Sequence, residues 1–172
     1  MKRHILLIGL PGSGKTTLGR MVAERLGAGF IDCDTMIVRK MQMPIAHIFG
    51  VHGEQRFREL EQEAMTSALQ GEPAVLSPGG GWAVQPGQLE LARPNTFIIY
   101  VKTMAMTAAR RAGSDNTRPM LTGEDPLEVM RNLLKEREPF YNKADAEVKN
   151  DTKPLETVAD EIVALAREKA GW

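Results

Sequence analysis

Residues 9–16 read Gly-Leu-Pro-Gly-Ser-Gly-Lys-Thr, which matches the pattern G-x-x-x-x-G-K-[ST] of a phosphate-binding loop. The glycines allow a tight turn in which successive backbone N–H groups face a polyphosphate. Lys15 brings a mobile positive charge to the β- and γ-phosphates, and the Thr16 hydroxyl is a ligand that Mg²⁺ accepts. The motif therefore predicts a site for the polyphosphate of a nucleotide together with Mg²⁺.

Two carboxylates follow a short apolar run in the segment Phe30-Ile31-Asp32-Cys33-Asp34. In an extended chain Asp32 and Asp34 share one face and Cys33 points to the other. The pair could serve Mg²⁺ and a hydroxyl nucleophile, or it could form an Asx turn that caps the next helix. The apolar run at 74–77 ends in Ser rather than Asp, so we expect Asp32 to supply the carboxylate on the magnesium side.

A second charged group lies within a predicted helix, where Glu54, Arg58 and Glu61 share a face with Phe57. Taken alone, an ordinary surface ion pair between Glu54 and Arg58 explains these residues better than a functional role does. The run Asn142-Lys143-Ala144-Asp145 matches the guanine signature N-K-x-D, but it follows charged residues instead of a buried strand. We therefore reject guanine recognition, because the structural context of the motif is missing.

The elements that must position these residues alternate between apolar runs of strand length and helical patterns, which predicts a parallel α/β sheet. A strand that feeds the phosphate loop and then a helix adds the helix dipole to the anion site. The predicted strands are His4–Gly9, Gly29–Asp32, Ala74–Ser77, Thr96–Val101 and Ala146–Lys149. The predicted helices are Lys15–Leu26, the middle of Ile45–Gln70, Pro86–Ala92, Met104–Arg111, Pro126–Tyr141 and Leu155–Lys169.

Two segments interrupt this alternation. Pro78-Gly79-Gly80-Gly81 directly follows a strand, where the ligand crevice of an open sheet lies. Residues 112–125 are polar, are long for a connection and contain Arg118 beside a proline. Long loops in compact domains are often functional, so this segment is predicted to be a lid.

Composition limits the classes of protein that remain. The 172 residues suit one domain, and the 22 basic and 22 acidic side chains cancel, which disfavours nucleic acid as the main partner. Cys33 is the single cysteine, so no internal disulfide can form, which fits the cytoplasm. No apolar run is long enough for a signal peptide or a membrane span. We expect a monomeric cytoplasmic protein.

Taken in order along the chain, these motifs resemble the shikimate kinase family. The resemblance runs from about His4 to Asp145 and is far more specific than the phosphate loop alone. It comprises the loop 9–16, Asp32 and Asp34, residues 53–61, the glycines 79–81, Arg118-Pro119-Met120-Leu121 and Arg137-Glu138-Pro139-Phe140-Tyr141.

The resemblance implies an α/β domain of the nucleoside-monophosphate-kinase type, with a five-stranded parallel sheet flanked by helices. It divides residues 1–172 into a core, a substrate-binding region at 33–61 and the lid at 112–125. It also implies ATP- and Mg²⁺-dependent phosphorylation of shikimate to shikimate 3-phosphate, a step in chorismate and aromatic amino-acid biosynthesis. The substrates are thus shikimate and ATP.

Site residues follow from the same resemblance, position by position. Lys15, Asp34 and Arg118 are expected to be catalytic, and Thr16 and Asp32 to serve the metal. The expected ATP-binding residues are Gly12, Ser13, Gly14, Lys15, Thr16, Thr17, Arg110 and Arg118. The expected shikimate-binding residues are Asp34, Arg58, Gly79, Gly80, Gly81 and Arg137.

The chain departs from the family pattern at two places. Pro78 and Trp82 flank the glycines, so Trp82 is expected to alter the wall of the pocket. After the last strand, Lys153 is the candidate to replace a nucleotide-side arginine. Two other hypotheses remain at this point: a gluconate-kinase-like small-molecule kinase, and a catalytically silent relative that binds nucleotide.

Overall fold

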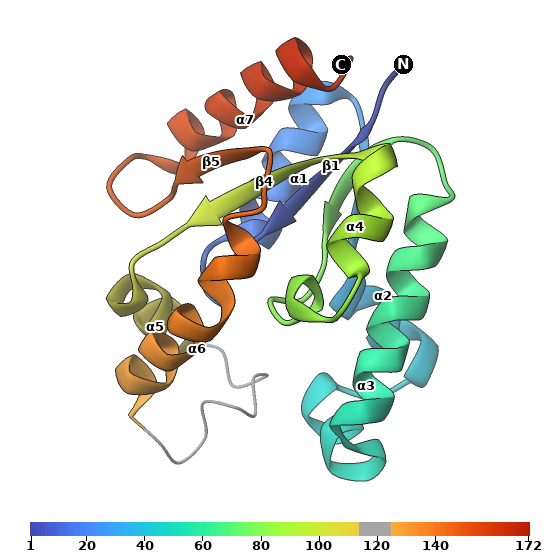
Figure 1. Ribbon diagram of the computed structural model, residues 1–172, viewed down its shortest axis with the longest axis vertical. Helices are drawn as coiled ribbons and strands as arrows, with labels where there is room; N and C mark the ends of the chain where they lie inside the picture. The colour runs from blue at the N-terminus through green and yellow to red at the C-terminus, as the bar shows by residue number, and fades with distance from the viewer. Residues whose placement is uncertain (114–124) are drawn as a thin grey trace.

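The computed structural model describes residues 1–113 and 125–172. A parallel sheet forms its centre, with helices on both faces (Figure 1). The spatial order of the strands is β2-β3-β1-β4-β5. The first strand therefore lies at the centre, β3 and β4 lie on either side of it, and β2 and β5 form the two edges. The strand bounds are β1 His4–Ile8, β2 Gly29–Asp32, β3 Ala74–Ser77, β4 Thr96–Lys102 and β5 Ala146–Lys149.

The described helices differ widely in length, and two of them are short 3₁₀ turns. Pro139 lies inside α6, and Gly53, with φ 81°, forms a kink inside α3. The α-helices are α1 Lys15–Leu26, α2 Cys33–Met41, α3 Ile45–Leu69, α4 Gln88–Ala92, α5 Ala105–Gly113, α6 Pro126–Tyr141 and α7 Leu155–Lys169. The 3₁₀ turns are η1 Trp82–Val84 and η2 Arg93–Asn95.

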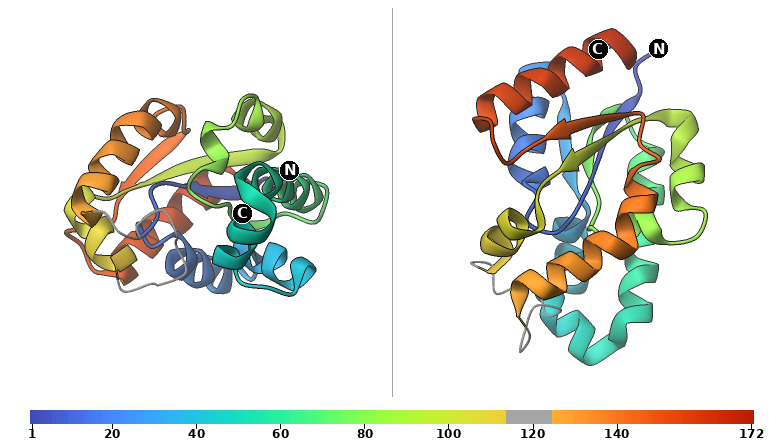
Figure 2. Two further views of the ribbon diagram at one scale, coloured as in Figure 1. Left: turned by 90° about the horizontal axis from the view of Figure 1, so that it is seen from below. Right: turned by 60° about the vertical axis from the view of Figure 1, so that its left-hand side comes forward.

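Alternation along β1 divides the hydrophobic core into two layers. Ile5 and Leu7 join the cluster that contains the apolar residues of α1 and α7. Leu6 and Ile8 join the larger cluster, which includes residues of α2, α3, α5 and α6. Because successive strand residues face opposite sides, the buried apolar residues 5–8 of β1 support both layers. Figure 2 shows the helices that cover the two faces of the sheet.

The parallel α/β fold predicted from the sequence is confirmed. The predicted bounds of β2, β3, β5, α1, α6 and α7 agree with the structure. The sequence prediction missed α2, whose start at Cys33 leaves no extended segment beyond Asp32. The helix predicted from Pro86 begins only at Gln88, because Gly87 precedes it in a left-handed conformation. Within the described residues, no helix has the length and apolar character needed to cross a membrane.

Candidate active site

The phosphate loop joins β1 to α1 and has the backbone shape that the motif predicts. Gly12 and Gly14 have φ values of 78° and 92°, a region that side chains rarely occupy. The Nζ of Lys15 donates to the carbonyl oxygens of Gly9 and Leu10, at 2.8 Å each. The ammonium group is thus held over the loop by backbone dipoles.

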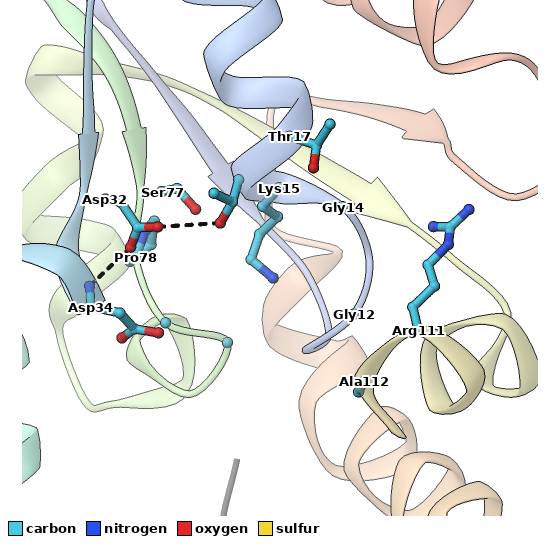
Figure 3. Close-up of a pocket in the computed structure, with 13 residues that line it drawn as sticks. Gly12, Gly14, Lys15, Thr17, Asp32, Asp34, Ser77, Pro78, Arg111 and Ala112 are labelled. Atoms are coloured by element: carbon cyan, nitrogen blue, oxygen red, sulfur yellow. Dashed lines mark hydrogen bonds between the residues drawn. The ribbon is translucent and has the colours of Figure 1, made fainter. Parts of the chain in front are cut away.

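The magnesium-side pair lies directly beside this loop. Thr16 Oγ1 donates to Asp32 Oδ2 at 3.2 Å, and Asp32 Oδ1 accepts the N–H of Asp34 at 3.0 Å (Figure 3). Asp32 therefore caps α2, which confirms the capping interpretation, and it also faces Thr16, while its role on the magnesium side stays a prediction. The hydroxyl and the carboxylate are hard oxygen donors of the kind that suits Mg²⁺.

The relation between the two aspartates differs from the prediction. Strand alternation cannot explain their common direction, because Asp34 lies in the first turn of α2 and not in a strand. Both nevertheless line the same cavity, which is a consequence of the helix start. Cys33 is fully buried in the core, and burial raises the pKa of its thiol.

A cavity of about 350 Å³ joins the phosphate loop to the strand ends (Figure 3). Arg111 and Ala112 of α5 complete its rim on the side away from the aspartates. The nucleotide elements and the glycine segment thus face one space. Its other lining residues are Gly12, Gly14, Lys15, Thr16, Thr17, Asp32, Asp34, Ser77, Pro78, Gly79 and Gly80.

Arg58 forms two ion pairs on α3, and they differ in burial. Its Nη1 lies 2.5 Å from Oε1 of Glu61, whose side chain is 1% exposed. Its Nη2 lies 3.4 Å from Glu54, which is 69% exposed. The surface-pair interpretation therefore fits only Glu54. Desolvation raises the pKa of Glu61, although the positive charge of Arg58 opposes the shift.

The triple glycine is packed against these charged groups. A Cβ atom on Gly79 would lie 2.5 Å from Oε2 of Glu61, and one on Gly81 would lie 2.6 Å from Nη1 of Arg58. A Cβ atom on Gly80 would lie 3.0 Å from Nη1 of Arg137. Any side chain in this segment would therefore displace an ionic group.

Besides the indole nitrogen of Trp82, three buried polar atoms of charged side chains near this segment have no hydrogen-bond partner within the part of the chain that the structure describes. They are Arg58 Nε, Arg137 Nη1 and Glu61 Oε2. Arg137 itself is only 7% exposed. Unsatisfied buried charge is costly, so the cluster is suited to a polar ligand that carries an anionic group.

Helix α6 supports the glycine segment through residues that the sequence prediction did not assign. The hydroxyl of Tyr141 donates to the carbonyl of Gly80 at 2.6 Å. The hydroxyl of Tyr100 donates to Glu138 at 2.9 Å, and the two tyrosine rings pack 5.2 Å apart. The only signal in the sequence was the closeness of Glu138 and Tyr141 to Arg137.

The expected nucleotide-side residues have three different outcomes. Arg111 lines the cavity, whereas Arg110 is exposed and is not part of the lining, because adjacent helical residues point in different directions. Lys153 forms an ion pair with Glu161 of α7 at 2.6 Å and does not line the cavity. Arg118 and residues 114–124 of the expected lid lie outside the described residues.

The structure places Trp82 behind the glycine segment, and its effect on the wall of the shikimate pocket stays a prediction. Trp82 is 1% exposed within the core and does not line the cavity at the phosphate loop. Its backbone N–H donates to the carbonyl of Gly79 at 3.1 Å, which closes the turn after the glycines. The indole therefore supports this segment from behind.

The fold and the site define a P-loop phosphotransferase: the phosphate loop, the bonded Thr16 and Asp32, and a cluster of buried charged side chains around the glycine segment all lie at the strand ends. A family model described as shikimate kinase matches residues 11–167. The shikimate kinase of Moorella thermoacetica is 40% identical over 94% of this chain and 93% of its own length. The shikimate kinase of Mycobacterium avium is 44% identical over 88% and 85%, respectively.

A solved structure shows the same relationship. The shikimate kinase from Acinetobacter baumannii in complex with shikimate superposes with a TM-score of 0.93 at 32% identity, covering 98% of this chain and 94% of that one. The chain belongs to the shikimate kinase family. It is an enzyme that phosphorylates shikimate with ATP and Mg²⁺, which removes the gluconate-kinase-like and silent-relative hypotheses.

Proposed function

We propose that shikimate lies between Asp34, the glycine segment 79–81 and the guanidinium groups of Arg58 and Arg137. The observation that carries this placement is the pair of desolvated arginines beside Gly80 and Gly81, whose Arg58 Nε and Arg137 Nη1 have no partner among the described residues. Guanidinium groups bind carboxylates through charge-assisted, often bidentate hydrogen bonds. The carboxylate of shikimate fits this requirement, and Glu61 positions Arg58 to receive it.

The reacting hydroxyl of shikimate then faces the phosphate loop across the cavity. Asp34 accepts the proton of the 3-hydroxyl as its oxygen attacks the γ-phosphorus of ATP, and ADP departs as the P–O bond breaks. Thr16 and Asp32 would hold Mg²⁺, which neutralises charge on the phosphates. Because phosphoryl transfer depends mostly on positioning and electrostatics, these residues need no covalent step.

On the nucleotide side, Lys15 balances the charge of the transferring phosphoryl group, and Arg118 completes that role from the lid at 112–125. We assign the other nucleotide-side arginine to Arg111 in preference to Arg110, because Arg111 lines the cavity. Backbone N–H groups of the loop hold the phosphates. The cradle consists of Gly12, Ser13, Gly14, Lys15, Thr16 and Thr17.

We propose in addition that residues 1–172 act as one monomeric domain in the cytoplasm, with residues 33–61 as the substrate-binding region. The buried thiol of Cys33 is consistent with a reducing compartment.

A coupled assay of ADP release tests the acceptor. We expect turnover with shikimate and at most background turnover with gluconate or nucleoside monophosphates, because only shikimate presents a carboxylate and a ring hydroxyl at the required positions. Turnover with gluconate at a rate similar to that with shikimate would contradict the proposed acceptor site.

Replacing each of the two aspartates by asparagine in turn separates their proposed roles. Asp34→Asn should lower kcat strongly at every Mg²⁺ concentration, because it removes the acceptor of the hydroxyl proton. Asp32→Asn should cause a loss that added Mg²⁺ partly restores, with little change in Tm, because an asparagine oxygen can still accept the N–H of Asp34 and cap α2. Mg²⁺ titrations of kcat for both variants provide the measurement. Equal losses that do not respond to Mg²⁺ would refute this division.

A further inference from the structure

Asn150 lies immediately after β5 and joins three parts of the site. Its side-chain Nδ2 donates to the carbonyl of Ser13 at 2.7 Å, and its backbone N–H donates to the carbonyl of Lys102 at 2.9 Å. Its own carbonyl accepts Nη1 of Arg111 at 3.0 Å. The residue is 1% exposed, so these bonds are shielded from water.

We propose that Asn150 is a positioning residue for the nucleotide, acting through the phosphate loop and Arg111. This inference rests on the proposed ATP site and assigns a role outside the loop motif. Asn150 does not line the cavity, so it acts through its neighbours and not by contact with the substrate.

The first step of the argument concerns the peptide between Ser13 and Gly14. A trans peptide is planar, and its C=O and N–H point in opposite directions. Because Asn150 holds the Ser13 carbonyl outward, the N–H of Gly14 must point the other way, as a phosphate cradle requires. Gly14 needs this restraint, since a glycine with φ 92° has many other backbone conformations available.

The second step concerns space around the same peptide. A Cβ atom on Gly14 would lie 2.5 Å from Nδ2 of Asn150 and 3.9 Å from Nη1 of Arg111. The loop, the amide and the arginine are therefore packed together, and a shift of one moves the others. Thr103 also approaches the Ser13 carbonyl, but at 3.5 Å it is a much weaker donor.

The third step concerns the cost of the arrangement. Oδ1 of Asn150 is buried and has no partner among the described residues. An unsatisfied buried acceptor is unfavourable, so overall stability alone is a poor reason for an asparagine at this position. Turning the amide over would bring Oδ1 against the Ser13 carbonyl, so the donating orientation is the one that the loop selects.

Two variants test the proposal. Asn150→Asp keeps the shape of the side chain but replaces the donor with a carboxylate, and Asn150→Ala removes both groups. We expect the KM for ATP to rise about tenfold in Asn150→Ala and further in Asn150→Asp, with the KM for shikimate changed less than twofold. Calorimetric titration with MgADP should show the same weakening without turnover.

Thr96→Val is the matched control, because its buried hydroxyl donates to the Ala92 carbonyl at 3.0 Å at the opposite end of the sheet. It should lower Tm but leave both KM values unchanged. An unaltered affinity for MgADP in either folded Asn150 variant, or equal increases in both KM values, would overturn the proposal. Failure of the proposed ATP site is distinct, since Lys15→Ala would then retain near-normal turnover.

Discussion

Replacement of Lys15 by alanine should lower kcat about a thousandfold or more. We propose that the ammonium group balances the charge of the transferring phosphoryl group, and preorganised charges of this kind dominate such reactions. The structure adds a cost in stability, because the same group donates to the carbonyls of Gly9 and Leu10. A modest decrease in Tm should therefore accompany the loss of turnover, which steady-state assays and thermal unfolding would measure.

Lys40→Ala serves as the control for Lys15. Lys40 is also a lysine in an ionic contact, 2.9 Å from Glu63, but its side chain is 59% exposed. Exposed ion pairs contribute little, so this variant should retain both its turnover and its Tm. Near-normal turnover in Lys15→Ala would contradict the assignment of the phosphate loop.

The fold could be predicted from the sequence because its signals are local. Apolar runs such as residues 4–8 and the glycines of the loop specify a buried strand and a tight turn without help from distant residues. Helix α2 was missed because its start depends on one side chain, Asp32, whose capping role and site role appear alike in sequence. The direction of Asp34 was therefore inferred from the wrong element.

Long-range contacts explain what the sequence could not provide. The bond from Asn150 to Ser13 spans 137 residues, and the bond from Tyr141 to Gly80 spans 61. No spacing rule connects positions so far apart. The choice between Arg110 and Arg111 also needed the rotation of α5 relative to the loop, which helical periodicity alone leaves open.

Arg137→Ala should reduce kcat/KM for shikimate roughly thirtyfold or more, while the KM for ATP changes little. Removing one member of a desolvated charge pair costs about 2–5 kcal/mol, and each decade of affinity corresponds to about 1.4 kcal/mol. Arg56→Ala is the control, because among the described residues Arg56 forms its ion pairs with the exposed Glu59 and Glu63 and not with the buried charged cluster.

Arg58→Ala should weaken the use of shikimate to a similar extent, but it should also destabilise the protein, because Glu61 would remain buried without its partner. Burial already raises the pKa of Glu61, and loss of Arg58 raises it further. A carboxyl whose folded pKa is raised disfavours the folded state as pH rises through that pKa. The deficit in Tm should therefore grow from acidic to neutral pH.

Adding Glu61→Gln to Arg58→Ala should recover Tm without restoring the use of shikimate. Recovery of normal shikimate kinetics in that double variant would show that Arg58 serves only to neutralise Glu61.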